Sequence, residues 1–183
     1  MWRYIAKRIL WMIPVIIGIS LIVFLLLNIA PGDPAQLILG GEATEESLEA
    51  LKEALCPETI LVSVMYVNNE VGAVMPVKDI ADMVHDICPK AVFHVDAIQA
   101  FGKFHLYPKR MGIDLMSVSG HKIHGPKGSG ALFVKRGTRI FPIILGGGQQ
   151  QVYRSGTENV PAIAGMCLAA EIADKEMDER CAH

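Results

Sequence analysis

Apolar residues fill most of the first thirty positions, and shorter apolar runs separated by polar turns follow them. Residues 9–30 carry no charged side chain, and a helix of this length spans roughly the 30 Å of a hydrocarbon core. Aromatic and basic side chains flank or precede this run: Trp2, Tyr4, Trp11, Arg3, Lys7 and Arg8. The pattern predicts one N-terminal transmembrane helix with a cytoplasmic N-terminus. The alternative, a cleaved signal peptide, usually has a shorter apolar stretch.

From residue 44 onward, short apolar segments alternate with helical patterns. Thr44 opens a capping-box pattern in front of a short amphipathic helix. The residues after it predict a helix at 77–88 and strands at 59–67, 91–97, 115–119 and 131–135. The first of these strands is apolar on both faces, as is typical of a central strand that is covered on both sides. The alternation predicts an α/β fold with a mostly parallel sheet and flanking helices, whose ligands bind at the carboxyl ends of the strands.

The charge balance and the cysteines exclude several kinds of function. The chain has 17 basic and 19 acidic side chains, so it has no basic surplus for binding nucleic acid. Its apolar content of 51% is too high for a disordered chain. The four cysteines lack the spacing of a zinc site or a disulfide framework, which fits a reducing compartment. This conflicts with the predicted topology, because a cytoplasmic N-terminus places the residues after the span outside.

Polar residues gather directly after three of the predicted strands. They are Asn68, Asn69 and Glu70 after the first, Asp96 and Gln99 after the second, and Ser119, Gly120, His121 and Lys122 after the third. A lysine in such a place, beside a hydroxyl, an imidazole and glycines, is suited to condense with an aldehyde next to an anion site. An aspartate at the neighbouring strand end can hold the proton of a pyridinium ring. These two groups are the protein's contribution to pyridoxal-phosphate chemistry.

The residues alone leave alternatives open at each of these positions. Lys103 and Lys127 are also lysines, and Asp96 is suited to cap the end of its strand. His94 fits a packed core histidine better than a catalytic one, and His121 fits either role. The glycine-rich stretch at 124–130 lacks the G-K-[ST] sequence of a nucleotide-binding P-loop.

Four sequence blocks carry a family resemblance: MYVNNEVG (65–72), FHVDAIQAFGK (93–103), SVSGHKIHGPKGSGALFVK (117–135) and GGGQQQVYRSGTENVPAIAG (146–165). Together they resemble the cysteine desulfurases of the pyridoxal-phosphate-dependent class V aminotransferase superfamily, over about residues 56–180. The resemblance implies part of the large domain of the pyridoxal 5'-phosphate (PLP)-dependent transferase fold. It also implies the family's reaction, which converts L-cysteine to L-alanine and an enzyme persulfide. That persulfide would supply sulfur for iron–sulfur clusters, through a scaffold protein or another sulfur acceptor.

The resemblance assigns roles to the residues at the predicted strand ends. Lys122 is implied as the catalytic lysine, which binds the aldehyde of the cofactor. Asp96 is implied to pair with the pyridine nitrogen and to keep it protonated. Gln99 would hydrogen-bond the phenolic oxygen of the cofactor, and Asn69 would lie close to that oxygen and to the substrate.

The phosphate contacts of the family also have matches. Ser119 and His121 match residues that contact the phosphate, and Thr157 matches one that reaches the phosphate of a neighbouring subunit, which implies a homodimer. Other family elements have no match here: the loop with the persulfide-forming cysteine, the arginine that binds the substrate carboxylate, and the amino-terminal third. We therefore expect residues 56–183 to be a desulfurase fragment with little or no activity alone.

Residues 1–55 resemble a different family. Basic residues, a long apolar span and then PGDPA are similar to the start of an inner-membrane permease subunit of dipeptide and oligopeptide ABC transporters. We therefore predict two segments, 1–55 and 56–183, joined in a chimera that is anchored in the membrane through residues 9–30. Such a join also explains the conflict of topology, since the desulfurase family is cytoplasmic. The alternatives are a truncated permease subunit and a non-functional chimeric reading frame.

Overall fold

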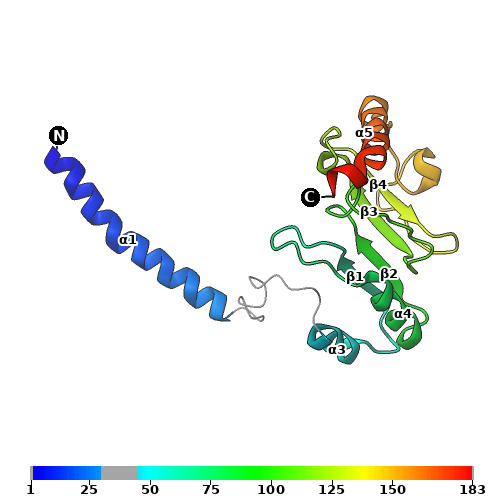
Figure 1. Ribbon diagram of the computed structural model, residues 1–183, viewed down its shortest axis with the longest axis horizontal. Helices are drawn as coiled ribbons and strands as arrows, with labels where there is room; N and C mark the ends of the chain where they lie inside the picture. Colours follow the sequence, from blue (N-terminus) through cyan, green and yellow to red (C-terminus); the bar gives the residue numbers. More distant parts are fainter. Residues whose placement is uncertain (1, 30–44, 183) are drawn as a thin grey trace. The chain divides into compact units, whose positions relative to one another are not determined.

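The computed structural model describes residues 2–29 and 45–182 of the chain, which divides into two units, Met1–Gly40 and Gly41–His183 (Figure 1). In the first unit, α1 (Trp2–Ile29) is a long helix with Pro14 inside it. It begins before the three basic residues, so these belong to the helix and do not precede it. Within the described part of the chain, no helix combines the length and the apolar character that crossing a membrane requires. The membrane span predicted at 9–30 is therefore not confirmed, and its last residue lies outside the described residues.

The second unit contains a four-stranded sheet in the order β1-β2-β3-β4 (Figure 1). Its strands are β1 (Leu61–Met65), β2 (Val92–Asp96), β3 (Leu115–Ser119) and β4 (Gly130–Val134). The first three are parallel, and β4 pairs with β3 in the antiparallel direction. The predicted α/β fold with a mostly parallel sheet is confirmed, and all four strands lie where the β-branched and apolar runs place them.

One detail of the predicted sheet is wrong. The apolar run at 59–67 predicts a central strand covered on both faces, yet β1 lies at the edge of the sheet formed by the described strands. Val62 is buried, whereas Leu61 on the other face is 54% exposed. An apolar run does not by itself fix how many neighbours a strand has, because pairing depends on the rest of the chain.

The core lies between one face of the sheet and α4 (Val77–Ile87). Phe93 and Val95 of β2 are fully buried, as are Ile80 and Val84 of α4. The apolar residues of α4 recur at helical spacing and form one stripe, which explains why this segment packs as a helix. The helix ends at Cys88, whose backbone N–H still donates to the carbonyl of Val84.

Two further helices complete the unit. α3 (Glu45–Ala54) packs Leu48 and Leu51 against the core, while its predicted cap, Thr44, lies outside the described residues. α5 (Val160–Arg180) begins at Asn159, whose side chain accepts a hydrogen bond from the backbone N–H of Ala162. It packs against the short 3-10 helix η1 (Gly120–Lys122), which directly follows β3. A second 3-10 helix, η2 (Gln149–Val152), lies before α5 in the sequence.

Candidate functional site

The carboxyl ends of the parallel strands bring several predicted site residues to one edge of the sheet. Asp96 is the last residue of β2 and Ser119 is the last residue of β3. The strand register pairs Asp96 with Met65 on one side and with Ser117 on the other. Side chains two residues apart share a face, so Asp96, Ser117 and Ser119 project from the same face of the sheet. The predicted gathering of polar groups at this edge is therefore observed for β2 and β3.

Ser119 at the end of β3 is followed by a tight turn that carries His121 and Lys122. The hydroxyl of Ser119 lies 2.7 Å from Nδ1 of His121, which leaves Nε2 of that ring available for another partner. Gly120 is buried between them, and a Cβ atom added to it would lie 2.4 Å from Oγ of Ser129. The amide of Gly125 also donates to the carbonyl of Gly120 at 2.8 Å. This packing fixes the backbone from which the Lys122 side chain projects.

The amine of Lys122 is exposed and forms no hydrogen bond or ion pair with the described residues. Its charge is nevertheless felt by Lys103, because burial first and then Lys122 lower the pKa of Lys103, against a smaller opposing effect of Cys181. Although Lys103 is largely exposed, its amine donates to the backbone carbonyl of Gln99 at 2.8 Å. Lys122, Lys103 and the Gln99 turn are therefore neighbours.

The two carboxylate oxygens of Asp96 differ in their hydrogen-bond partners. Oδ1 accepts a hydrogen bond from the backbone N–H of Ile98 at 2.9 Å, as expected if Asp96 caps its strand. Oδ2 has no hydrogen-bond or ion-pair partner among the described residues, and the side chain is half-buried. The capping interpretation and the cofactor interpretation are therefore compatible, since each needs only one oxygen.

The remaining predicted residues are less constrained. Asn69 follows β1 and is exposed, whereas its neighbour Asn68 closes the turn by accepting hydrogen bonds from the amides of Glu70 and Val71 at 2.9 and 3.0 Å. Thr157 is exposed in the loop before α5 and makes no hydrogen bond with the described residues. The structure thus does not bring Thr157 into contact with the other predicted site residues.

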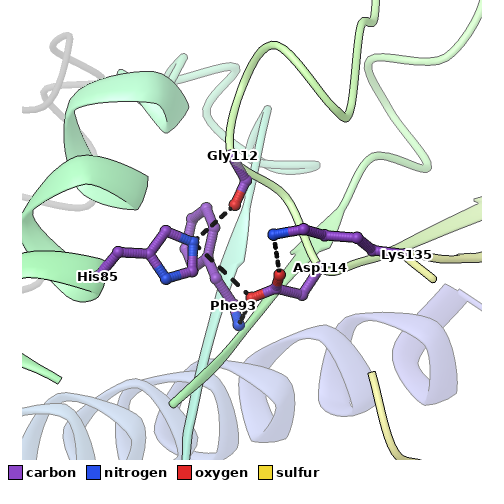
Figure 2. Close-up of polar contacts among 5 residues, drawn as sticks. All are labelled: His85, Phe93, Gly112, Asp114 and Lys135. Atoms are coloured by element: carbon purple, nitrogen blue, oxygen red, sulfur yellow. Dashed lines mark hydrogen bonds and ion pairs between the residues drawn. The ribbon is translucent and has the colours of Figure 1, made fainter. Parts of the chain in front are cut away.

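A second polar cluster lies at the amino-terminal end of β3, away from this edge (Figure 2). Asp114, which is 7% exposed, accepts hydrogen bonds from the backbone N–H of Phe93 at 3.0 Å and from the amine of Lys135 at 2.8 Å. Nε2 of His85 lies 2.9 Å from the carbonyl oxygen of Gly112 and 3.7 Å from Oδ2 of Asp114 (Figure 2). The polar atoms of these residues are paired with one another, so we interpret the cluster as structural. No sequence motif predicted this cluster.

The groups at the carboxyl edge fit PLP better than a metal ion. In the described part of the chain, no group of three or more His, Cys, Asp or Glu side chains is placed to hold a metal. A primary amine, a free carboxylate oxygen and a hydroxyl–imidazole pair are instead the partners of an aldehyde, a protonated pyridine nitrogen and a phosphate. The chemistry of the side chains present therefore suits this cofactor.

Comparison with known proteins agrees with this fold. Residues 37–183 match the family described as aminotransferase class-V, and the chain belongs to this family, whose members depend on PLP. It is 47% identical over 132 residues to a cysteine desulfurase of Gluconacetobacter diazotrophicus, covering 72% of this chain and 32% of that protein. It is 50% identical over 125 residues to a cysteine desulfurase of a Nostoc species, covering 68% of this chain and 31% of that one.

Solved structures give the same result. A NifS-like protein superposes with a TM-score of 0.70 at 44% identity, over 72% of this chain and 36% of its own. The structure of SspA in complex with cysteine matches with a TM-score of 0.64 at 41% identity, over 67% of this chain and 35% of its own. The chain thus spans about a third of the length of these relatives.

None of these matches supports the resemblance of residues 1–55 to a transporter permease. The family match begins at residue 37, within that segment, and α3 at Glu45–Ala54 packs against the desulfurase-like core. The permease resemblance depends on one apolar run and one short motif, and none of the relatives named above supports it.

Proposed function

We propose that this chain carries a PLP-binding part of a cysteine desulfurase, with Lys122 as the lysine that binds the cofactor aldehyde. One observation carries the proposal: in a chain similar to cysteine desulfurases, an amine free of described partners follows β3, and Asp96 at the end of the neighbouring strand β2 keeps one oxygen free of described partners. Lys103 and Lys127 are weaker candidates. The amine of Lys103 already donates to a backbone carbonyl, and Lys127 lies further along the exposed loop.

Each side chain at the edge has a task in this proposal. When bound, PLP supplies an electron sink for the α-carbon of an amino acid. Oδ2 of Asp96 would accept a hydrogen bond from the protonated pyridine nitrogen, and the negative charge of the carboxylate would keep the proton on that nitrogen. The Ser119 hydroxyl orients the His121 ring through Nδ1, so that Nε2 can donate to a phosphate oxygen. The amine of Lys122 would hold the cofactor and then move a proton to or from the substrate.

The assignments for Gln99, Asn69 and Thr157 rest on the family resemblance. The side-chain amides of Gln99 and Asn69 form no hydrogen bond with the described residues, which leaves both available to the cofactor. Thr157 is exposed, as a residue that reaches a neighbouring subunit must be. A homodimer is part of the same proposal, as is an iron–sulfur scaffold or another protein as sulfur acceptor. Light scattering of the purified chain, with and without PLP, tests the dimer.

Trapping with borohydride tests the central assignment. The chain is incubated with PLP, reduced with borohydride and digested, and the labelled peptide is identified by mass spectrometry. We expect the label on Lys122, its loss in Lys122→Ala, and unchanged labelling in the matched control Lys127→Ala. A label that stays at full yield in Lys122→Ala would contradict the proposal.

L-Cysteine is the proposed substrate, since relatives are named cysteine desulfurases and one solved relative holds cysteine. Sulfur transfer needs a reactive thiol that reaches the substrate. Here the thiol of Cys88 is buried and donates to the carbonyl of Cys56, and that of Cys181 lies 3.5 Å from the carbonyl of Lys103. None of the four cysteines lies in a block that resembles the family's persulfide loop. We expect this 183-residue chain to release sulfide from cysteine no faster than Lys122→Ala does, and a clear excess would contradict that expectation.

A further inference from the structure

A histidine next to Asp96 links three strands of the sheet through its two ring nitrogens. Nδ1 of His94 lies 2.7 Å from the hydroxyl of Ser63 on β1, and Nε2 lies 3.1 Å from the hydroxyl of Ser117 on β3. His94 itself is on β2, between them. Its side chain is half-buried, so it is not the packed core histidine that the sequence favours.

Ser63, His94 and Ser117 form a hydrogen-bonded row whose donors and acceptors match one another. A neutral imidazole has one N–H donor and one acceptor nitrogen, and each serine hydroxyl can donate or accept. Either tautomer of His94 therefore satisfies both contacts. A protonated ring would donate to both hydroxyls, so the row also persists when the ring is charged.

The row is placed so that it acts on Asp96. His94 and Asp96 are two residues apart on β2 and share a face of the sheet. The register partner of His94 on β3 is Leu115, but its ring reaches past that level to Ser117, which is the register partner of Asp96. The hydroxyl of Ser117, which contacts His94, therefore belongs to the residue of β3 that is level with Asp96. Ser63, in contrast, is at the level of His94 itself.

We infer that His94 is a positioning residue, which holds Asp96 toward the PLP ring by fixing the ends of β2 and β3 through Ser117. This inference rests on the proposed function, because Asp96 needs a fixed orientation only if Oδ2 meets a bound pyridine nitrogen. The hydrogen bond from the backbone N–H of Ile98 to Oδ1 of Asp96, at 2.9 Å, provides an independent probe of that orientation.

The test compares His94→Phe, which keeps a flat ring and removes both hydrogen bonds, with His94→Gln, which keeps a donor and an acceptor. Two quantities are measured on the full 183-residue chain: the dissociation constant for PLP, and amide hydrogen exchange of Ile98 without cofactor. We expect His94→Phe to weaken PLP binding and to speed Ile98 exchange, each by about tenfold, because only one of the two lost hydrogen bonds, that with Ser117, is level with Asp96. His94→Gln should restore both to near the unsubstituted values.

The amide of Phe93 provides the matched control. It lies near the other end of β2 and donates to Asp114, so its exchange reports the stability of the strand as a whole. A positioning role predicts faster exchange at Ile98 with little change at Phe93. Equal acceleration at both amides would show a purely structural role and would overturn the inference.

The two serines sharpen the test further. Ser117→Ala should reproduce the effect of His94→Phe, and Ser63→Ala should have a smaller effect, because only Ser117 is level with Asp96. The opposite order would contradict the inference. If the unsubstituted chain does not bind PLP at Lys122, the proposed function fails. If it does bind and His94→Phe binds equally well, only the role of His94 fails.

Discussion

Lys103 lies close enough to Lys122 for the charge of the second amine to lower the pKa of the first. Burial is the larger cause, and it remains when Lys122 is replaced. We therefore expect Lys122→Ala to raise the pKa of Lys103 part of the way back to its usual 10.5. Titration of carbon-13-methylated lysines by NMR measures this directly. Lys127→Ala removes a nearby but uncoupled amine and should leave the titration unchanged. Identical midpoints in all three proteins would show that the two amines are not neighbours.

Tyr66 links the β1 end of the site to the pH dependence of stability. Its ring packs 5.5 Å from that of Phe104, and burial raises its pKa above 10.0. In the unfolded chain the phenol ionises near pH 10, whereas in the folded chain it stays neutral to higher pH. The free energy of unfolding should therefore hold below pH 10 and decrease as the pH rises above it. Urea unfolding at about pH 9 and about pH 11 should show a smaller decrease for Tyr66→Phe. The same decrease in both proteins would exclude Tyr66 as a contributor.

The structural cluster in Figure 2 should contribute more to stability than its charges alone suggest. Asp114→Ala leaves the buried N–H of Phe93 without an acceptor, which costs about 1 to 3 kcal/mol in the free energy of unfolding. Asp114→Asn keeps an acceptor for that N–H while removing the ion pair with Lys135, so it should cost less. Urea unfolding of the three proteins measures the difference.

An exposed ion pair supplies the control for that experiment. Lys78 and Asp82 are four residues apart on α4, and both are more than half exposed. Asp82→Ala should cost no more than about 0.5 kcal/mol, because exposed pairs are screened by water. A loss for Asp82→Ala as large as that for Asp114→Ala would show that the N–H of Phe93 is not what makes Asp114 important.

The sequence was sufficient for the strands, for α4 and for the edge at which the polar groups gather. Those features depend on local patterns: β-branched runs for the strands, apolar residues at helical spacing for α4, and the rule that parallel strands end together. Asp96 and Ser119 could be placed for the same reason. Pro76 and Cys88 at the ends of α4 likewise agree with the predicted helix at 77–88.

Other features could not be predicted because they depend on register and on contacts distant in sequence. The edge position of β1 depends on which strands pair, and the His94–Ser117 contact depends on how β2 and β3 are aligned. The nearness of Lys103 to Lys122 arises only when the turns after β2 and β3 meet. Single-sequence patterns carry no information about such pairings.

Gly120 supplies the sharpest test of the turn that positions Lys122. A methyl group at this position would lie 2.4 Å from Oγ of Ser129, a buried hydroxyl that already donates to the carbonyl of Pro126 at 2.6 Å. Gly120→Ala should therefore reduce the free energy of unfolding by about 1 to 3 kcal/mol, as overpacking does. It should also lower the yield of cofactor label on Lys122, since the displaced residue is two positions away.

The matched control for Gly120 is Gly148, where an added methyl group meets open space and the φ of −90° suits alanine. Gly148→Ala should leave the free energy of unfolding unchanged or slightly higher, because alanine has less freedom in the unfolded chain. If the clash with Ser129 is the cause, the double variant Gly120→Ala/Ser129→Ala should be more stable than the sum of the two single effects implies, because removing the hydroxyl makes room for the methyl group. Simple additivity in urea unfolding would mean that Ser129 is not the obstacle, and the loss would then have to arise from the other close neighbours of Gly120, Met166 and Pro126.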